Sequence, residues 1–191
     1  MRLIRQTKQT SQRGMTLMEI ALAMPIIMLA LGMFTQMLSA GTGLRQSSRE
    51  NWLASLRSQD VLETIRNQDF RQLAALYNED PLDDPDGPGT APGIHFSVAE
   101  LRPLANDPDG FVGRVFIPML NAGTEIAPDW QLREDLDIPA LGLPRDLNGD
   151  SVIDDQDHSG DFTVLPVEVE IEWQSRFGPR QVRIHTLFSE L

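Results

Sequence analysis

A long apolar segment near the N-terminus constrains this chain more than any other feature. Between Met15 and Leu38 the only charged residue is Glu19, and apolar side chains would cover every face of a helix. About 20 such residues match the hydrocarbon thickness of a bilayer. We therefore expect a transmembrane helix over residues 15–40. A charge inside such a segment marks a candidate functional residue.

The charges that flank this segment are distributed unevenly. Residues 1–14 contain four basic residues and no acid, although the whole chain has a net charge of −12. The positive-inside rule therefore places residues 1–14 in the cytoplasm and the body of the protein outside. Because nucleic acid should repel so acidic a body, we expect no nucleic-acid partner. The chain has no cysteine, which excludes disulfides, thiolate metal sites and a cysteine nucleophile.

Three interpretations of the N-terminal segment compete. A cleaved secretory signal has a shorter apolar core, followed by a small-residue cleavage site that this sequence lacks. A plain signal anchor accounts for the length and the charges but gives no reason for Glu19. The third interpretation rests on a family resemblance.

The residues from Gly14 to Glu19 read Gly-Met-Thr-Leu-Met-Glu and lie between a basic leader and an apolar helix. This pattern resembles the prepilin motif of type IV pilins and type II secretion pseudopilins. The resemblance implies that a prepilin peptidase cleaves between Gly14 and Met15 and that Met15 becomes the N-methylated first residue. It also places Glu19 at the acidic position of the family.

The energetic cost of Glu19 in lipid suggests a role for this acid. An uncompensated acid in a membrane helix costs about 2.5–3.5 kcal/mol on insertion scales. When helices pack side by side in a filament, its carboxylate can pair with the cationic N-terminal amine of a neighbouring subunit. We expect Glu19 to set the register of assembly in this way, as a buried polar group does in a coiled coil.

Beyond the apolar segment, apolar residues recur at spacings of three and four, which predicts an amphipathic helix over residues 41–77. Gly41 and Gly43 are expected to interrupt the helix. Residues 78–93 are dense in proline, glycine and aspartate, which indicates a loop. The remaining head, residues 78–191, is expected to be rich in strands.

Two strands are predicted at residues 95–101 and 111–118, and the clearest hairpin pairs 167–173 with 182–188. In that hairpin apolar and polar residues alternate with a period of two. A turn around Phe177-Gly178-Pro179 would place Ile171 opposite Ile184. A long N-terminal helix packed on a small antiparallel sheet is an α+β fold. The pilin resemblance implies the same architecture, a pilin-like roll.

An acidic segment at residues 146–157 is the second chemical feature. It resembles the calcium loop of EF-hands and, more closely, of dockerin repeats, whose alternating residues supply the oxygen ligands that calcium prefers. The resemblance implies side-chain ligands from Asp146, Asn148, Asp150 and Asp157, the carbonyl of Val152, and Asp154 through water. Ser151 stands where glycine makes the sharp turn, so we expect a left-handed residue there, and we expect Ile153 in the core. A structural calcium ion is favoured over a solvated acidic turn.

No sequence pattern indicates catalysis: the three histidines lack zinc-type spacing, and nucleophile-elbow, P-loop and Rossmann motifs are absent. We interpret the chain as a non-enzymatic minor pilin or pseudopilin-like subunit of the bacterial inner membrane. Its head would be periplasmic, or extracellular in a filament, and its partners would be prepilin peptidase and other pilin or pseudopilin subunits. The alternative is a single-pass, signal-anchored extracytoplasmic protein with a calcium-stabilised binding domain. A pilus, a secretion machine and a DNA-uptake machine all remain open.

Overall fold

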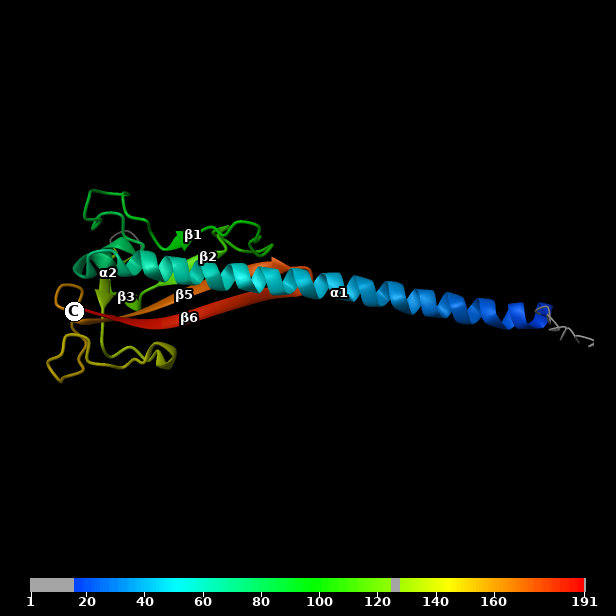
Figure 1. The fold of residues 1–191 in the computed structure, drawn as a ribbon. Coiled ribbons are helices and arrows are strands. Elements are labelled where there is room, and N and C mark those ends of the chain that lie inside the picture. Colours follow the sequence, from blue (N-terminus) through cyan, green and yellow to red (C-terminus); the bar gives the residue numbers. More distant parts are fainter. Residues whose placement is uncertain (1–15, 125–127, 191) are drawn as a thin grey trace, which may run out of the picture. The chain divides into compact units, whose positions relative to one another are not determined.

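The computed structural model describes residues 16–124 and 128–190, so Gly14 and Met15 lie outside the described residues. The chain divides into two compact units, residues 1–45 and residues 46–191. The first element, α1 (Leu17–Arg66), begins in the first unit and ends in the second (Figure 1). The predicted fold class is confirmed: the chain is α+β, with one long N-terminal helix and a small antiparallel sheet.

The helix departs from its predicted extent at two places. It passes through Gly41 and Gly43 without interruption, because an isolated glycine weakens a helix by only about 1 kcal/mol. It ends at Arg66 rather than Tyr77. Asp69 adopts an extended backbone there and caps a separate short turn by accepting a hydrogen bond from the Arg71 amide. The elements that follow are η1 (Phe70–Gln72) and α2 (Leu73–Leu76).

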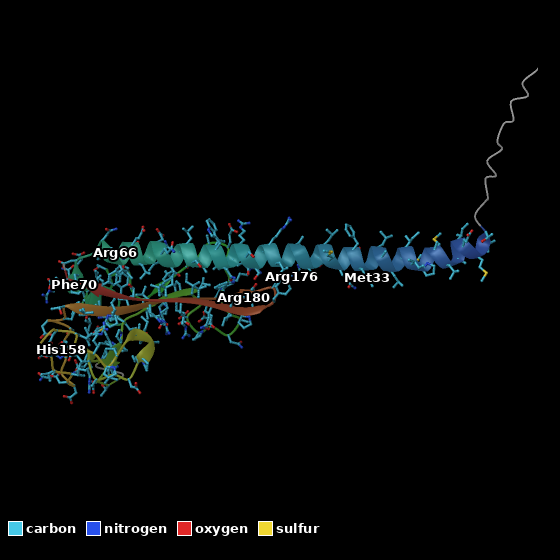
Figure 2. All side chains as sticks on the ribbon, turned by 60° about the horizontal axis from the view of Figure 1, so that its bottom comes forward. Met33, Arg66, Phe70, His158, Arg176 and Arg180 are labelled. Carbon is cyan, nitrogen blue, oxygen red and sulfur yellow. The ribbon has the colours of Figure 1, made fainter. Side chains whose placement is uncertain are left out.

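In the first unit, the large apolar side chains of α1 are exposed to solvent. Met33, labelled in Figure 2, is 70% exposed, and the other large apolar residues from Leu17 to Leu38 are also exposed. By length and composition α1 can cross a membrane. So much contiguous apolar surface needs lipid or neighbouring helices to cover it.

The second unit is built on a four-stranded antiparallel sheet with the order β1-β2-β5-β6, beside a separate hairpin of β3 and β4. The sheet strands are β1 (His95–Phe96), β2 (Gly113–Phe116), β5 (Val164–Ser175) and β6 (Gly178–Ser189). The smaller hairpin consists of β3 (Met119–Asn121) and β4 (Trp130–Leu132), and the turn η2 (Pro139–Leu141) follows it. Residues 78–93 form no helix or strand, as predicted.

The β5–β6 hairpin is confirmed, but its predicted register is wrong by two residues. Ile171 pairs with Val182 rather than Ile184, because the turn is made by Arg176 and Phe177 alone. Side chains alternate with a period of two along a strand, so a shift of two residues leaves every side chain on its predicted face. The predicted strand at 95–101 is reduced to β1, and a turn replaces its second half: the Leu101 amide donates to the Val98 carbonyl, and Glu100 has a φ of +71°.

The face of α1 that packs on the sheet is narrower and smaller than the sequence pattern predicts. Ala54 packs with Ile171 and Trp173, whereas Val61 and Ile65 join the larger core around β5. Trp52 and Leu56 share the spacing that predicts this amphipathic helix and are therefore expected on its apolar face, but they are 62% and 47% exposed. Small buried residues allow the helix backbone to approach the sheet closely, and these are Ser47, Ala54 and Ser58.

Candidate functional site

In the first unit, Glu19 takes part in a local arrangement that sequence reasoning missed. Its Oε2 atom accepts hydrogen bonds from the Thr16 amide at 2.9 Å and from the Thr16 hydroxyl at 3.1 Å. In return, the Glu19 amide donates to the Thr16 hydroxyl at 3.3 Å. This reciprocal pair is a capping box, and the Thr-x-x-Glu spacing in the sequence was the available indication. Glu19 therefore stabilises the start of its own helix.

In the second unit, the long connection between β4 and β5 carries all of the residues predicted to bind a cation. It is anchored to the core by Leu143, Leu147 and Phe162, which are buried. The hydrogen bond from the Thr163 amide to the Leu147 carbonyl, 2.8 Å long, closes the acidic segment at its base. Burial of its apolar residues holds this connection in place despite its lack of strands.

Glu134 lies at the start of this connection and is fully buried. Its Oε1 atom accepts hydrogen bonds from the amides of Leu147 at 2.6 Å and Asn148 at 3.2 Å. Its Oε2 atom is also buried, and among the described residues it has no hydrogen-bond partner. A buried carboxylate with one unpartnered oxygen is costly unless something compensates it.

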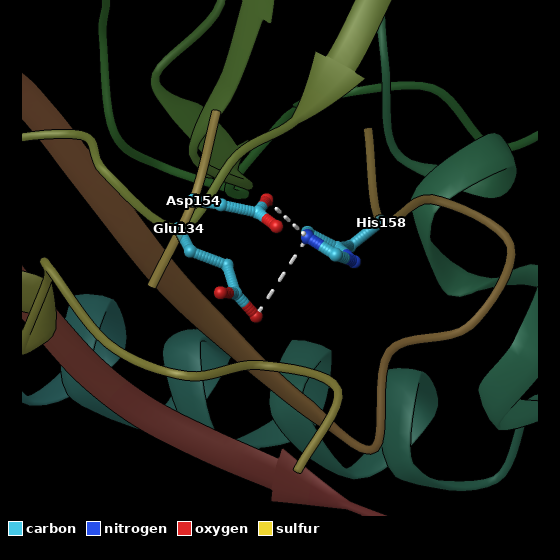
Figure 3. A group of neighbouring side chains, drawn as sticks. All are labelled: Glu134, Asp154 and His158. Atoms are coloured by element: carbon cyan, nitrogen blue, oxygen red, sulfur yellow. Dashed lines mark hydrogen bonds and ion pairs between the residues drawn. The ribbon is translucent and has the colours of Figure 1, made fainter. Parts of the chain in front are cut away.

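His158 is the basic side chain that faces Glu134, and it is itself buried. Its Nε2 atom is 3.1 Å from Asp154 Oδ1 and 3.9 Å from Glu134 Oε1, and the dashed lines in Figure 3 meet at this nitrogen. On the other side of the ring, Nδ1 is 3.0 Å from Asp161 Oδ1. Burial lowers the pKa of His158, but the hydrogen bonds with Asp154 and Asp161 and the charge of Glu134 outweigh burial and raise it.

Glu134, Asp154 and His158 form a group that could hold a metal ion. One ligand atom from each lies within 4.8 Å of the others, and no other such group of three acidic or histidine residues occurs in residues 16–124 and 128–190. The sequence prediction included Asp154 but neither of its neighbours. Glu134 lies outside the loop in sequence, so no spacing pattern reveals it, and the three histidines lack the spacing that would indicate His158 as a metal ligand.

The first half of the predicted calcium loop folds as a series of side-chain-capped turns. The carboxylate of Asp146 accepts hydrogen bonds from the amides of Gly149 at 2.6 Å and Ser151 at 2.7 Å. The side chains of Asn148 and Asp150 each accept from the amide two residues further on. The left-handed backbone predicted at Ser151 is confirmed, with φ at +70°.

In the second half of that loop, Asp154 and Asp157 interact with residues outside the loop. Asp154 faces His158, whereas Asp157 accepts hydrogen bonds from the amides of Leu132, in β4, and Ser159, both at 3.0 Å. The prediction that Ile153 enters the core is wrong, since its side chain is 50% exposed. The six predicted ligands therefore divide into two sets. Four belong to the locally hydrogen-bonded loop, whereas Asp154 and Asp157 contact residues outside it.

No protein-family model, curated protein or solved structure matches this chain.

Proposed function

We propose that this chain is a minor pilin or pseudopilin-like subunit. A prepilin peptidase would cleave it after Gly14, Met15 would be N-methylated, and residues 15–40 would hold it in the bacterial inner membrane. Assembly into a type IV pilus or a secretion pseudopilus would then proceed through the N-terminal helix and Glu19. The mechanism is assembly rather than catalysis.

The observation that carries the proposal is an exposed apolar segment of α1 whose single acid, Glu19, lies at its beginning. The large apolar side chains from Leu17 to Leu38 are exposed, and lipid or neighbouring helices would cover them. A plain membrane anchor would account for that surface but not for the position of Glu19 within the sequence Gly-Met-Thr-Leu-Met-Glu.

The capping box gives this proposal a definite mechanism. In the isolated chain the Glu19 carboxylate is occupied by Thr16. Cleavage after Gly14 would create a cationic amine on Met15, the residue directly before Thr16. In a filament, the carboxylate would exchange its local partner for the amine of a neighbouring subunit, and the charge pair would define the register between helices.

Mass spectrometry of the native protein tests the proposal directly. We expect a mature chain that begins with N-methylated Met15. An intact leader would refute the proposal and favour the alternative, a signal-anchored extracytoplasmic protein that binds a partner through its head.

Two variants separate the capping role of Glu19 from its proposed assembly role. Glu19→Gln keeps an acceptor for the capping box but removes the charge, whereas Thr16→Ala weakens the cap but keeps the charge. We expect Glu19→Gln to reduce incorporation into filaments and Thr16→Ala to leave it largely intact. Normal incorporation of Glu19→Gln would show that the charge has no part in assembly.

We also propose that the loop at residues 146–157 binds a structural calcium ion through the side chains of Asp146, Asn148 and Asp150 and the carbonyl of Val152. The left-handed Ser151 and the turns around Asp146 support this assignment. Calcium titration of the purified full-length chain should show binding that Asp150→Asn weakens. Failure of the wild-type protein to bind millimolar calcium would refute the assignment.

A further inference from the structure

The charges around His158 do not balance, although only the Glu134 carboxylate among them is fully buried. Three carboxylates, those of Glu134, Asp154 and Asp161, lie within 4 Å of its ring nitrogens. No other cation forms an ion pair with Glu134 among the described residues. Even a protonated imidazole therefore leaves this cluster negative, and the fully buried Glu134 retains an unpartnered oxygen. A cation bound by the Glu134 carboxylate would compensate this negative charge.

We propose that Glu134, Asp154 and His158 bind a divalent transition-metal ion of the zinc class, through ligands other than the four that we assign to calcium under the proposed function. The site requires neither cleavage of the leader nor filament assembly. Its ligands come from the two ends of one connection: Glu134 follows β4, whereas Asp154 and His158 precede β5. A metal ion here would close the connection between residues 134 and 158.

The donor set determines the class of metal. Calcium and magnesium take oxygen ligands, whereas an imidazole nitrogen together with carboxylates suits zinc and related transition metals. Tetrahedral ligation with bonds near 2.0–2.1 Å separates ligand atoms by about 3.3 Å. The Nε2 atom of His158 is 3.1 Å from Asp154 Oδ1 and 3.9 Å from Glu134 Oε1. Small side-chain movements would bring all three to bonding distance.

The surroundings of the three ligands also match those of a metal site. A metal-binding histidine usually donates its other ring N–H to a carboxylate, which fixes the tautomer and the ring orientation. Asp161 is placed to accept that hydrogen bond from Nδ1 at 3.0 Å. Glu134 is held by the amides of Leu147 and Asn148. The ring and the buried carboxylate are thus positioned before any metal arrives.

Zinc titration of the metal-free full-length protein in detergent, followed by calorimetry, tests the proposal. We expect one zinc ion per chain in the wild-type protein. Asp154→Asn and Glu134→Gln should each weaken zinc binding at least about tenfold, and Asp161→Asn by about 10- to 100-fold. Asp155→Asn is the matched control: it removes a charge from an exposed neighbour outside the cluster and should leave zinc affinity unchanged.

Two further measurements make each outcome decisive. Near-ultraviolet circular dichroism establishes that each variant is folded, and Asp154→Asn changes a partly exposed side chain, so it serves even if Glu134→Gln unfolds. Nitrogen-15 NMR of the histidine rings should show zinc bound at Nε2 of His158. Absence of one-site zinc binding, or an equal loss in Asp155→Asn and Asp154→Asn, would overturn the proposal. Calcium titration of Asp150→Asn reports separately on the calcium loop.

Discussion

The two units of this chain differ in whether their apolar side chains are exposed or buried. In residues 16–45, large apolar side chains are exposed and the one acid of the apolar segment caps its own helix. In residues 46–190, apolar side chains fill two cores and several polar side chains are buried beside them. The first unit is thus defined by a local sequence pattern, and the second by contacts between distant residues.

This difference determines which structural features can be predicted from the sequence. In the N-terminal helix the residues that interact, such as those of the capping box, lie within a few positions of one another. Their pattern can therefore be recognised along the chain. The group at His158 combines residues from two ends of a long connection, and only folding brings them together. Variants with matched changes in the two units test how far the contrast extends.

The largest contrast should come from deleting a phenylalanine in each unit. Phe162 is fully buried and its ring centroid lies 4.9 Å from that of Phe70, so Phe162→Ala should destabilise the head by about 3–5 kcal/mol. Phe34 is exposed, so Phe34→Ala should leave head stability unchanged. Chemical unfolding of the full-length protein in detergent, followed by tryptophan fluorescence, measures both. Equal losses would contradict the division into two units.

A smaller loss of stability is expected from replacing Glu50, which joins α1 to the β5–β6 hairpin. Its Oε2 atom accepts hydrogen bonds from the hydroxyl of Ser175 at 2.6 Å and from Nε1 of Trp173 at 3.3 Å. Hydrogen bonds to a charged group each contribute about 1.5–3 kcal/mol, and exposure reduces that value, so Glu50→Ala should cost about 1–2 kcal/mol. Glu63→Ala, on an exposed part of α1, is the matched control and should change little.

The contribution of Glu50 should also depend on pH. Burial raises its pKa, but the hydrogen bonds from Ser175, Trp173 and Gln46 outweigh burial and lower the pKa below its ordinary value of 4.5. A lowered folded-state pKa means that the stabilisation is complete above the unfolded-state pKa and is lost as the pH falls through the folded-state value. The stability difference between wild type and Glu50→Ala should therefore shrink below about pH 4. A constant difference down to about pH 2 would contradict this.

The fold class and the hairpin could be predicted because both rest on periodicity. Alternation along β5 and β6 identifies their faces whatever the register, which explains why a two-residue error in pairing did no harm to the predicted core face. The end of α1 could not be predicted, because apolar spacing continues past Arg66 while Asp69 caps a new turn. The exposure of Trp52 depends on how closely the helix approaches the sheet, and sequence spacing does not record that distance.

The candidate site was predictable only in part, for a related reason. The left-handed Ser151 follows from a local motif. Glu134 belongs to no motif, and its burial results from the packing of the connection around Leu132 and Leu147. Asp157 was assigned to the ion because spacing cannot foresee that the Leu132 amide needs an acceptor.

Two substitutions that act through the backbone, one in each unit, should change stability by smaller amounts. Ser151 adopts a left-handed conformation that costs a non-glycine residue about 1–2 kcal/mol, so Ser151→Gly should stabilise the head by up to about 1 kcal/mol. Gly32 lies inside α1, and the space that an alanine β-carbon would fill there is open, so Gly32→Ala should strengthen the helix by about the same amount. Thermal unfolding measures the first, and amide exchange within α1 measures the second. Destabilisation by Ser151→Gly would show that the serine side chain matters more than its backbone.

The most local effect is expected at the capping box. Thr16→Ala removes the hydroxyl that accepts a hydrogen bond from the Glu19 amide, and loss of an N-cap residue costs about 1 kcal/mol. Because the first unit has its own contacts, this loss should appear as faster amide exchange in the first turn of α1 and leave the unfolding of the head unchanged. Asp69→Ala is the matched change in the second unit, where the lost cap lies beside the core around Phe70 and should lower head stability. A lower head stability in Thr16→Ala would mean that the two units unfold together, in which case the local cap at Glu19 would help to stabilise the whole chain.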